Sequence, residues 1–367
     1  MKTVLLVFGT RPEAIKMAPL VKELINHPDL NPCVCLTAQH RSMLDQVMDF
    51  FELNADFDLD LMQPDQSLTK LAGKALQGLS DVINEVEPAA ILVQGDTTST
   101  FCGALAGFYA RVPVGHVEAG LRTGDIYSPY PEEMNRLLST RLAKWHFAPT
   151  GMNKANLINE GVGQEDIFVT GNTVIDALFW ARDKQKDSVG FGKDQIRPYI
   201  LITGHRRESF GTGFESICNA ISTLAKHCPD YDFIYPMHLN PNVREPVNRI
   251  LGNLSNVRLI EPLSYPEFVS LMSGAYFILT DSGGVQEEAP SLGKPVLVMR
   301  ETTERKEGLG GGVCLVGTNA EIIVNEGLKL IKDKKHYQIM SEAQNPYGDG
   351  LAAKKIIEVL SRDLVAI

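Results

Sequence analysis

The sequence has few cysteines and none of the spacings that bind zinc. Its 367 residues include six, which are Cys33, Cys35, Cys102, Cys218, Cys228 and Cys314. No C-x-x-C pair occurs, and no Cys/His run has the spacing of a structural zinc site. This pattern excludes a disulfide framework and predicts the buried, reduced thiols of a cytoplasmic protein.

Long apolar runs are also absent. No segment approaches the roughly 18 apolar residues of a membrane span. The apolar start, Thr3–Phe8, stops at Gly9 and is followed by Arg11 and Glu13, so it is too short and wrongly flanked for a signal peptide. We therefore expect no membrane association.

Positive charge is in deficit. The chain has 35 Lys and Arg against 45 Asp and Glu, a net charge of −10. Such a chain is a poor electrostatic partner for nucleic acid or an anionic membrane, so any anionic ligand must be held by a local cluster of positive groups. The 44% hydrophobic and 22% charged residues are ordinary for buried cores and exclude disorder as the dominant state.

The common cofactor motifs are missing. No G-x-G-x-x-G, G-x-x-x-x-G-K-[ST] or H-E-x-x-H occurs, which weakens dinucleotide, P-loop and zinc-hydrolase interpretations. Asp58-Leu59-Asp60 imitates a metal-binding pair, but its acidic surroundings before Pro64 favour a solvated turn. We expect no cofactor and no metal site.

What the chain does contain is a series of short apolar runs separated by helical patterns such as Ala14–Ile25 and Phe214–His227. Continuous apolar character predicts strands covered on both faces, hence parallel sheets. Length and pattern together predict an α/β protein with two Rossmann-like, doubly wound domains. The expected domains are 1–180 and 198–350, joined by a charged linker over 181–197. The runs are Thr3–Phe8, Cys33–Ala38, Ala89–Gln94, Val112–Glu118, Trp145–Ala148, Ile167–Thr170, Tyr199–Thr203, Asp232–Met237, Val257–Ile260, Tyr276–Thr280, Pro295–Met299 and Val313–Val316.

Ligands of open parallel sheets bind beyond the carboxyl ends of the strands, which selects the polar residues worth attention. The strongest signal is Ser282-Gly283-Gly284 after a strand, because a glycine pair at a helix N-terminus suits a phosphate. Glu288, near one helical turn inside, is placed to accept two ribose hydroxyls. The alternative is a tight turn in which Ser282 is a plain N-cap.

Further candidates follow other strands in both halves, so a cleft between the domains is the expected meeting place. Arg11 and Lys16 are candidate anion partners, with solvated surface charge as the alternative. His205, flanked by Arg206 and Arg207, adds a titratable imidazole.

Acidic residues are expected at the mouth of the same cleft. They are Asp96, Glu118 and the adjacent pair Glu132-Glu133. Carboxylates repel a diphosphate, so general acid/base catalysis on the sugar or other organic half explains them better than binding. Capping and turn roles are the alternative, and suit Asp96 best.

These strings together resemble the non-hydrolysing UDP-N-acetylglucosamine 2-epimerases over nearly the whole chain. The matching segments are Phe8–Lys16, Gly95–Thr98, Gly115–Gly124, Pro131–Arg136, Gly204–Glu208, Asp281–Pro290 and Asn345–Gly350. The resemblance implies a glycosyltransferase-B-like pair of domains facing a cleft, with the last helix, 351–367, returning to the first domain. It also implies homodimers, and interconversion of UDP-GlcNAc with UDP-ManNAc through UDP elimination to 2-acetamidoglucal and re-addition.

By this resemblance Asp96, Glu118 and Glu132 are the acid/base set, and His205 neutralises charge on the leaving diphosphate. The implied UDP or substrate contacts are Arg11, Lys16, His238, Phe268, Ser282, Gly283, Gly284 and Glu288. Gln39 and His40, with Arg206 and His238, resemble part of a second UDP-GlcNAc site that activates some relatives. Ser42 departs from the Gln of some of those relatives, and Cys314 stands where relatives often carry Lys or Arg.

The resemblance leaves alternatives open. A glycosyltransferase on the same architecture, a hydrolysing epimerase and a catalytically silent nucleotide-sugar sensor share the expected site. A transferase needs a binding site for an acceptor and usually one base, whereas this chain offers several acids and no evident acceptor site. A sensor that does no chemistry would not need the acids.

Overall fold

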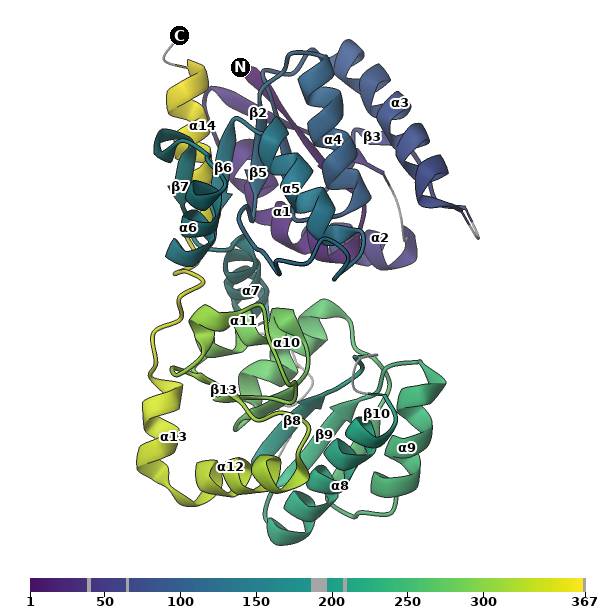
Figure 1. Ribbon diagram of the computed structural model, residues 1–367, viewed down its shortest axis with the longest axis vertical. Coiled ribbons are helices and arrows are strands. Elements are labelled where there is room, and N and C mark those ends of the chain that lie inside the picture. Colours follow the sequence, from purple (N-terminus) through teal and green to yellow (C-terminus); the bar gives the residue numbers. More distant parts are fainter. Residues whose placement is uncertain (38–40, 64–65, 186–196, 207–209, 366–367) are drawn as a thin grey trace. The chain divides into compact units, whose positions relative to one another are not determined.

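A computed structural model describes residues 1–37, 41–63, 66–185, 197–206 and 210–365. The chain divides into two compact units, which we call unit 1 (Met1–Ala177 with Tyr347–Ile367) and unit 2 (Leu178–Pro346). Figure 1 shows their elements. In the described chain, no helix combines the length and the apolar character that crossing a membrane requires.

Unit 1 is built on a parallel sheet with strand order β3-β2-β1-β4-β5-β6-β7. Crossover connections lead from each strand to the next, as a doubly wound topology requires. Its elements are β1 Lys2–Phe8, α1 Arg11–Ile25, β2 Leu30–Leu36, α2 Arg41–Phe50, β3 Phe57–Asp58, α3 Leu68–Val86, β4 Ala90–Gln94, α4 Thr98–Tyr109, β5 Val114–Val117, α5 Glu132–Leu142, β6 Trp145–Ala148, α6 Gly151–Asn159, the short 3-10 helix η1 Gln164–Asp166, β7 Ile167–Val169 and α14 Ala352–Val365, with α7 Thr173–Lys184 beginning in this unit.

The core of unit 1 follows from the alternation of its strands. Leu5, Val7, Cys33 and Cys35 face one side of the sheet and pack with buried residues of α3 and α4. Burial of such a side chain stabilises the fold by roughly 1.5–3 kcal/mol. Cys33 and Cys35 therefore share a face, as predicted, and all six cysteines are free thiols.

The C-terminal helix α14 belongs to unit 1, where it packs against α1 (Figure 1). Its N-terminus is held by Asp176, whose carboxylate accepts hydrogen bonds from the backbone N–H groups of Ala352 and Ala353 at 3.2 and 2.8 Å. Near its other end, Asp363 accepts a 2.7 Å hydrogen bond from the Trp145 indole. Two separated stretches of chain thus complete one unit.

Unit 2 contains a parallel sheet with strand order β10-β9-β8-β11-β12-β13. Buried residues of β8, β9, β11 and β12 pack with α8, α9 and α12 to form its core. Its elements are β8 Tyr199–Thr203, α8 Thr212–His227, β9 Asp232–Pro236, α9 Pro241–Leu251, β10 Val257–Ile260, α10 Tyr265–Gly274, β11 Ile278–Thr280, α11 Gly283–Ser291, β12 Val296–Val298, the short 3-10 helix η3 Lys306–Gly308, β13 Val313–Leu315, α12 Ala320–Lys332 and α13 Lys334–Ser341.

The predicted α/β class is confirmed, with two local differences. The sheet of unit 1 has a strand that the sequence did not indicate, β3, whose two residues are too few for an apolar pattern. Asp58 therefore ends an edge strand instead of lying in a turn. The expected linker begins inside α7, which continues to Lys184 because Leu178 and Ala181 form a buried stripe. Residues 186–196 lie outside the described chain.

Candidate functional site

In unit 1, the turns after β1 and β4 are tied together by one buried carboxylate. Glu13 is 2% exposed and accepts hydrogen bonds from the backbone N–H groups of Gly9 and Thr10 at 3.0 and 2.8 Å. It also accepts one from the Thr97 hydroxyl at 2.6 Å. Burial raises the pKa of Glu13, and these hydrogen bonds oppose the rise. The turn that carries Asp96 is therefore tied by Glu13 to the turn after β1.

Glu118, directly after β5, is surrounded by donors from α1, from the end of β4 and from the segment after β7. Its backbone adopts the left-handed region, with φ of 66°. Lys16 Nζ lies 2.7 and 2.6 Å from its two carboxylate oxygens, and Asn172 Nδ2 donates at 3.1 Å. The Gln94 side chain donates a further hydrogen bond. An ammonium and two amides favour the ionised form of this nearly buried carboxylate.

Asp96 is paired with an arginine from α5. Arg136 donates to Asp96 Oδ2 from Nε at 3.0 Å and from Nη2 at 2.5 Å, while its Nη1 donates to Glu133 at 2.8 Å. Glu133 in turn accepts the backbone N–H groups of Thr123 and Gly124 at 3.0 and 3.1 Å. Arg136 therefore links a candidate acid to the loop before α5.

Glu132 differs from the other two candidate acids. It is the first residue of α5, and its Oε2 atom is buried without a hydrogen-bond partner in the described residues. An unpartnered buried carboxylate oxygen is costly, which points to a partner that the described residues do not supply. The three candidate acids thus have three different environments.

A buried imidazole, that of His116 in β5, lies next to the turn after β4. His116 Nε2 is 2.7 Å from the Gly95 carbonyl oxygen, so this nitrogen carries the donated hydrogen. Burial lowers the pKa of His116 to about 4. The side chain is therefore neutral near pH 7 and supports the turn that carries Asp96.

In unit 2, a cavity of about 230 Å³ opens at the carboxyl ends of the strands. Its walls are mainly apolar, and its polar groups converge from several strand ends, the arrangement typical of small-molecule sites. The lining residues are Thr203, Gly204, His205, Pro236, Met237, His238, Pro262, Leu263, Phe268, Ser282, Val285 and Glu288.

One wall of this cavity is the turn Ser282-Gly283-Gly284, which begins α11. Ser282 is the N-cap residue but makes no side-chain capping hydrogen bond, contrary to the plain N-cap alternative. A Cβ on Gly283 would lie 2.7 Å from the Arg305 guanidinium carbon, so a larger residue there would require the Arg305 side chain to move. Arg305 is itself ion-paired with Glu287 at 2.6 Å. Such a helix N-terminus offers backbone donors to an anion.

Three further side chains of the cavity come from different elements. His205 and His238 stack with ring centroids 5.2 Å apart and planes inclined by 10°. Glu288, the sixth residue of α11, accepts a 3.1 Å hydrogen bond from the Tyr265 hydroxyl. Phe268 lines the cavity from α10.

The structure thus gathers the predicted residues into one set in each unit. Lys16, Asp96, Glu118 and Glu132 lie at the strand ends of unit 1, and Arg11 begins α1 there. The charge that Lys16 meets in the structure is Glu118, a carboxylate of the protein itself. Arg206 follows His205 in unit 2, whereas Gln39 and His40 lie outside the described residues. Cys314 is half-buried in β13.

Several partners were not singled out from the sequence. Asn172 lies just past the strand ending at Val169, so the rule of inspecting strand ends would have found it. Arg136 sits one helical turn after Glu133, a spacing that brings charges together. Tyr265 carried no distinguishing signal, whereas Asp281 stood in a matching segment directly after a strand without being given a role.

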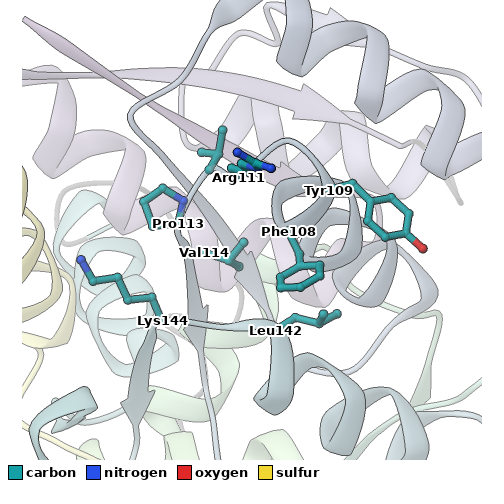
Figure 2. Close-up of a pocket in the computed structure, with 8 residues that line it drawn as sticks. Phe108, Tyr109, Arg111, Pro113, Val114, Leu142 and Lys144 are labelled. Atoms are coloured by element: carbon teal, nitrogen blue, oxygen red, sulfur yellow. The ribbon is translucent and has the colours of Figure 1, made fainter.

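A second cavity, of about 610 Å³, lies in unit 1 where β5 and β6 begin, and Figure 2 shows it. It therefore opens at the opposite end of these strands from Glu118. Phe108, Tyr109 and Leu142 contribute apolar walls, with Arg111 and Lys144 beside them. It contains none of the predicted site residues.

Comparison with known proteins agrees with this architecture. A family described as UDP-N-acetylglucosamine 2-epimerase matches residues 22–361. The UDP-N-acetylglucosamine 2-epimerase of Escherichia coli K12 is 55% identical, covering 99% of this chain and 100% of the relative. A crystal structure of the Neisseria meningitidis enzyme bound to UDP-GlcNAc superimposes with a TM-score of 0.91 at 50% identity, covering 98% of this chain and 100% of that one. A Methanocaldococcus jannaschii structure in complex with UDP-GlcNAc and UDP gives 0.81 at 32% identity, covering 98% and 99%.

The two parallel-sheet units place the protein in the glycosyltransferase-B-like class of α/β proteins. Within that class, the chain belongs to the UDP-N-acetylglucosamine 2-epimerase family.

Proposed function

We propose that this protein catalyses the reversible epimerisation of UDP-GlcNAc to UDP-ManNAc at C2 of the sugar. The observation that carries the proposal is the set of three carboxylates at the strand ends of unit 1, each in a different environment. Removing and returning a C2 proton on opposite faces of the sugar requires acid/base groups on both faces.

The proposed reaction proceeds by elimination and re-addition. A base of the protein takes the C2 proton, the C2–H electron pair forms the C1–C2 double bond, and the C1–O bond breaks to release UDP. The resulting 2-acetamidoglucal stays bound. UDP then adds back to C1 while an acid protonates C2 from the other face. Each step conserves electrons without a nicotinamide cofactor or a metal.

Asp96, Glu118 and Glu132 are the proposed acid/base residues. Lys16 and the two amides around Glu118 stabilise its carboxylate form, which suits a group that accepts a proton. Oε2 of Glu132 has no partner in the described part of the chain, which suits a group that meets the substrate directly. The paired Asp96 carboxylate is oriented by Arg136.

The cavity of unit 2 is the proposed nucleotide site of the same substrate. Phe268 packs on the uracil, Glu288 accepts the ribose hydroxyls, and the backbone of Ser282, Gly283 and Gly284 donates to phosphate. His205 and His238 lie on the same cavity, and His205 offsets the charge of the departing diphosphate. Arg11 and Lys16 are further proposed contacts. A second UDP-GlcNAc acting as an activator through Arg206 and His238 stays a prediction.

Proton NMR in heavy water tests the reaction. Purified protein and UDP-GlcNAc are incubated without added metal or nicotinamide. We expect exchange of the C2 proton for deuterium together with growth of UDP-ManNAc. Accumulation of UDP with free ManNAc would favour a hydrolysing epimerase instead. Binding without exchange would contradict both and favour a sensor or an acceptor-dependent transferase.

The homodimer is a separate part of the proposal. Phe108 and Tyr109 at the end of α4 are 58% and 67% exposed, a surface that a second copy of the chain would cover. Light scattering should give twice the chain mass. Phe108→Glu with Tyr109→Glu should give the mass of one chain, whereas Ile339→Glu, also at an exposed apolar position, should leave the dimer intact. A monomeric wild type would refute the dimer, and a dimeric double variant would refute this surface.

A cytoplasmic location also belongs to the proposal. Six free cysteines, five of them buried, fit a reducing compartment.

A further inference from the structure

Asp281 is a buried acid of unit 2 with one satisfied and one unsatisfied oxygen. It follows β11, and its side chain is fully buried. Oδ2 accepts the backbone N–H groups of His205 and Arg206 at 2.7 and 2.8 Å. Oδ1 is buried and has no hydrogen-bond partner in the described residues. A purely structural turn-binding role accounts for Oδ2 but leaves Oδ1 unexplained.

The nearest basic group to the unsatisfied oxygen is the His205 ring. His205 Nδ1 lies 3.7 Å from Asp281 Oδ1, about half an ångström beyond an ordinary hydrogen bond. The two backbone hydrogen bonds to Oδ2 fix the carboxylate, so a small movement of the exposed imidazole suffices to close the pair. Its other nitrogen, Nε2, is then the one left for a ligand.

Among the described residues, the other titratable groups that act on His205 are Arg206 and His238. Burial lowers the pKa of His205, Asp281 raises it, and both His238 and Arg206 lower it further. His238 is stacked on His205, and its Nδ1 accepts the backbone N–H of Asn240 at 3.1 Å. Nε2 of neutral His238 therefore carries the hydrogen and is a donor. Together these influences lower the pKa of His205 below its ordinary value, so without a ligand the imidazole is neutral near pH 7.

We propose that Asp281 is the positioning residue of His205: when a diphosphate enters the cavity, His205 takes up one proton from solvent, Nδ1–H closes onto Asp281 Oδ1, and Nε2–H is directed at the anion. The proton is released to solvent when the diphosphate departs. This inference rests on the proposed function, because it takes the nucleotide diphosphate as the occupant of the unit 2 cavity. Asp281 itself touches no substrate and acts through His205.

Asp281→Asn separates this role from support of the turn. The amide oxygen can still accept the two backbone N–H groups, but the amide nitrogen then faces His205 Nδ1 and donates to it, which holds the ring neutral. Asp232→Asn is the matched control, because Asp232 is also a buried carboxylate of unit 2 and is paired with Arg197 and Arg258 at 3.3 and 2.8 Å. Asp232→Asn should leave the protonation of His205 unchanged.

The first measurement is the protonation of His205, followed by NMR of labelled histidine with and without UDP. Near pH 7, UDP should convert His205 to the imidazolium in the wild type and in Asp232→Asn but not in Asp281→Asn. Calorimetry in buffers of different ionisation enthalpy should show greater proton uptake on UDP binding in the wild type than in His205→Ala. That comparison keeps the inference testable even if Asp281→Asn does not fold. Equal uptake in the wild type and His205→Ala, or formation of the His205 imidazolium on UDP binding in Asp281→Asn, would overturn it.

The second measurement is a double-mutant cycle on kcat for epimerisation. Asp281→Asn should lower kcat by roughly 10²–10³-fold in the wild type, the scale of losing one charge-stabilising group, and should add little to His205→Ala. An equal loss in both backgrounds would refute action through His205. The UDP measurements require no turnover, so a failure of the proposed epimerisation remains distinguishable from a failure of this inference.

Discussion

Units 1 and 2 use the same parallel-sheet design but place different chemistry after their strands. In unit 1 the strand ends carry carboxylates, and two of them are already matched by Lys16 and Arg136. In unit 2 the strand ends surround a cavity with apolar walls, two imidazoles and a glycine turn. The first arrangement holds charge ready for proton transfer, whereas the second offers shape and backbone donors. We infer that one topology supports a catalytic unit and a nucleotide-binding unit because the loops, and not the sheet, carry the chemistry.

The sharpest test of this division is Asp96→Asn. We expect kcat for epimerisation to fall by roughly 10²–10⁴-fold, because a proton-transferring or proton-orienting carboxylate is lost, while UDP affinity stays within about twofold. Asp56→Asn is the control. Asp56 is also a carboxylate of unit 1, and within the described residues it accepts a hydrogen bond from the backbone N–H of Val34 at 2.7 Å. Comparable losses of UDP binding and of kcat would contradict the division of labour between the units.

A second test uses the pH dependence of the free energy of unfolding, to which buried histidines of unit 1 contribute. Burial lowers the pKa values of His116 and His146 in unit 1 to about 4, against an ordinary value of 6.5. Their stabilising contribution is complete above pH 6.5 and is lost as the pH falls toward 4, because the unfolded chain binds protons that the native state does not. The loss is about 3 kcal/mol for each histidine. Asp176 has the opposite sign, since burial raises its pKa to about 6.

Urea unfolding of His116→Asn isolates the histidine contribution from that of Asp176. The difference in unfolding free energy between wild type and variant should shrink by about 3 kcal/mol from pH 6.5 to pH 4. His227→Asn, at an exposed position in unit 2, should show no such trend. A constant difference for His116→Asn would mean that the pKa of this imidazole is the same in the folded and the unfolded protein.

Glu288→Gln tests the binding side of the comparison. Hydrogen bonds to a charged group contribute about 1.5–3 kcal/mol, so the Kd for UDP should rise roughly ten- to hundredfold by calorimetry. Glu245→Gln, at an exposed position on α9, should leave the Kd unchanged. If Glu288→Gln instead lowers kcat with unchanged UDP affinity, Glu288 belongs with the catalytic carboxylates.

The smallest expected effect is that of Phe268→Leu. Loss of an aromatic contact with the uracil should weaken UDP binding by about 0.5–1.5 kcal/mol, roughly two- to tenfold. Phe168→Leu, at an aromatic position of β7 in unit 1, is the control and should bind UDP normally. Tighter or unchanged binding by Phe268→Leu would remove Phe268 from the nucleotide site.

Much of the fold could be predicted because its cause is local. Apolar runs such as 199–203 and 278–280 became strands, and Phe214–His227 lies within α8. The two residues of β3 could not be predicted, because so short a strand depends on its neighbour β2 and not on its own pattern. The helical start of the expected linker was not predicted, because its one buried residue, Ala181, is followed by the charged residues of α7.

By itself, the sequence determined the α/β class, the order of the strands along the chain and the polar residues that follow them, since these depend on local periodicity and turn chemistry. Only the tertiary structure decided which polar groups meet. Lys16 pairs with Glu118 across 102 positions of sequence, and Asp281 holds His205 across 76. A charge acquires its partner and its burial from loops that converge at one sheet edge, and the environment created there decides whether a carboxylate orients a neighbour or exchanges a proton.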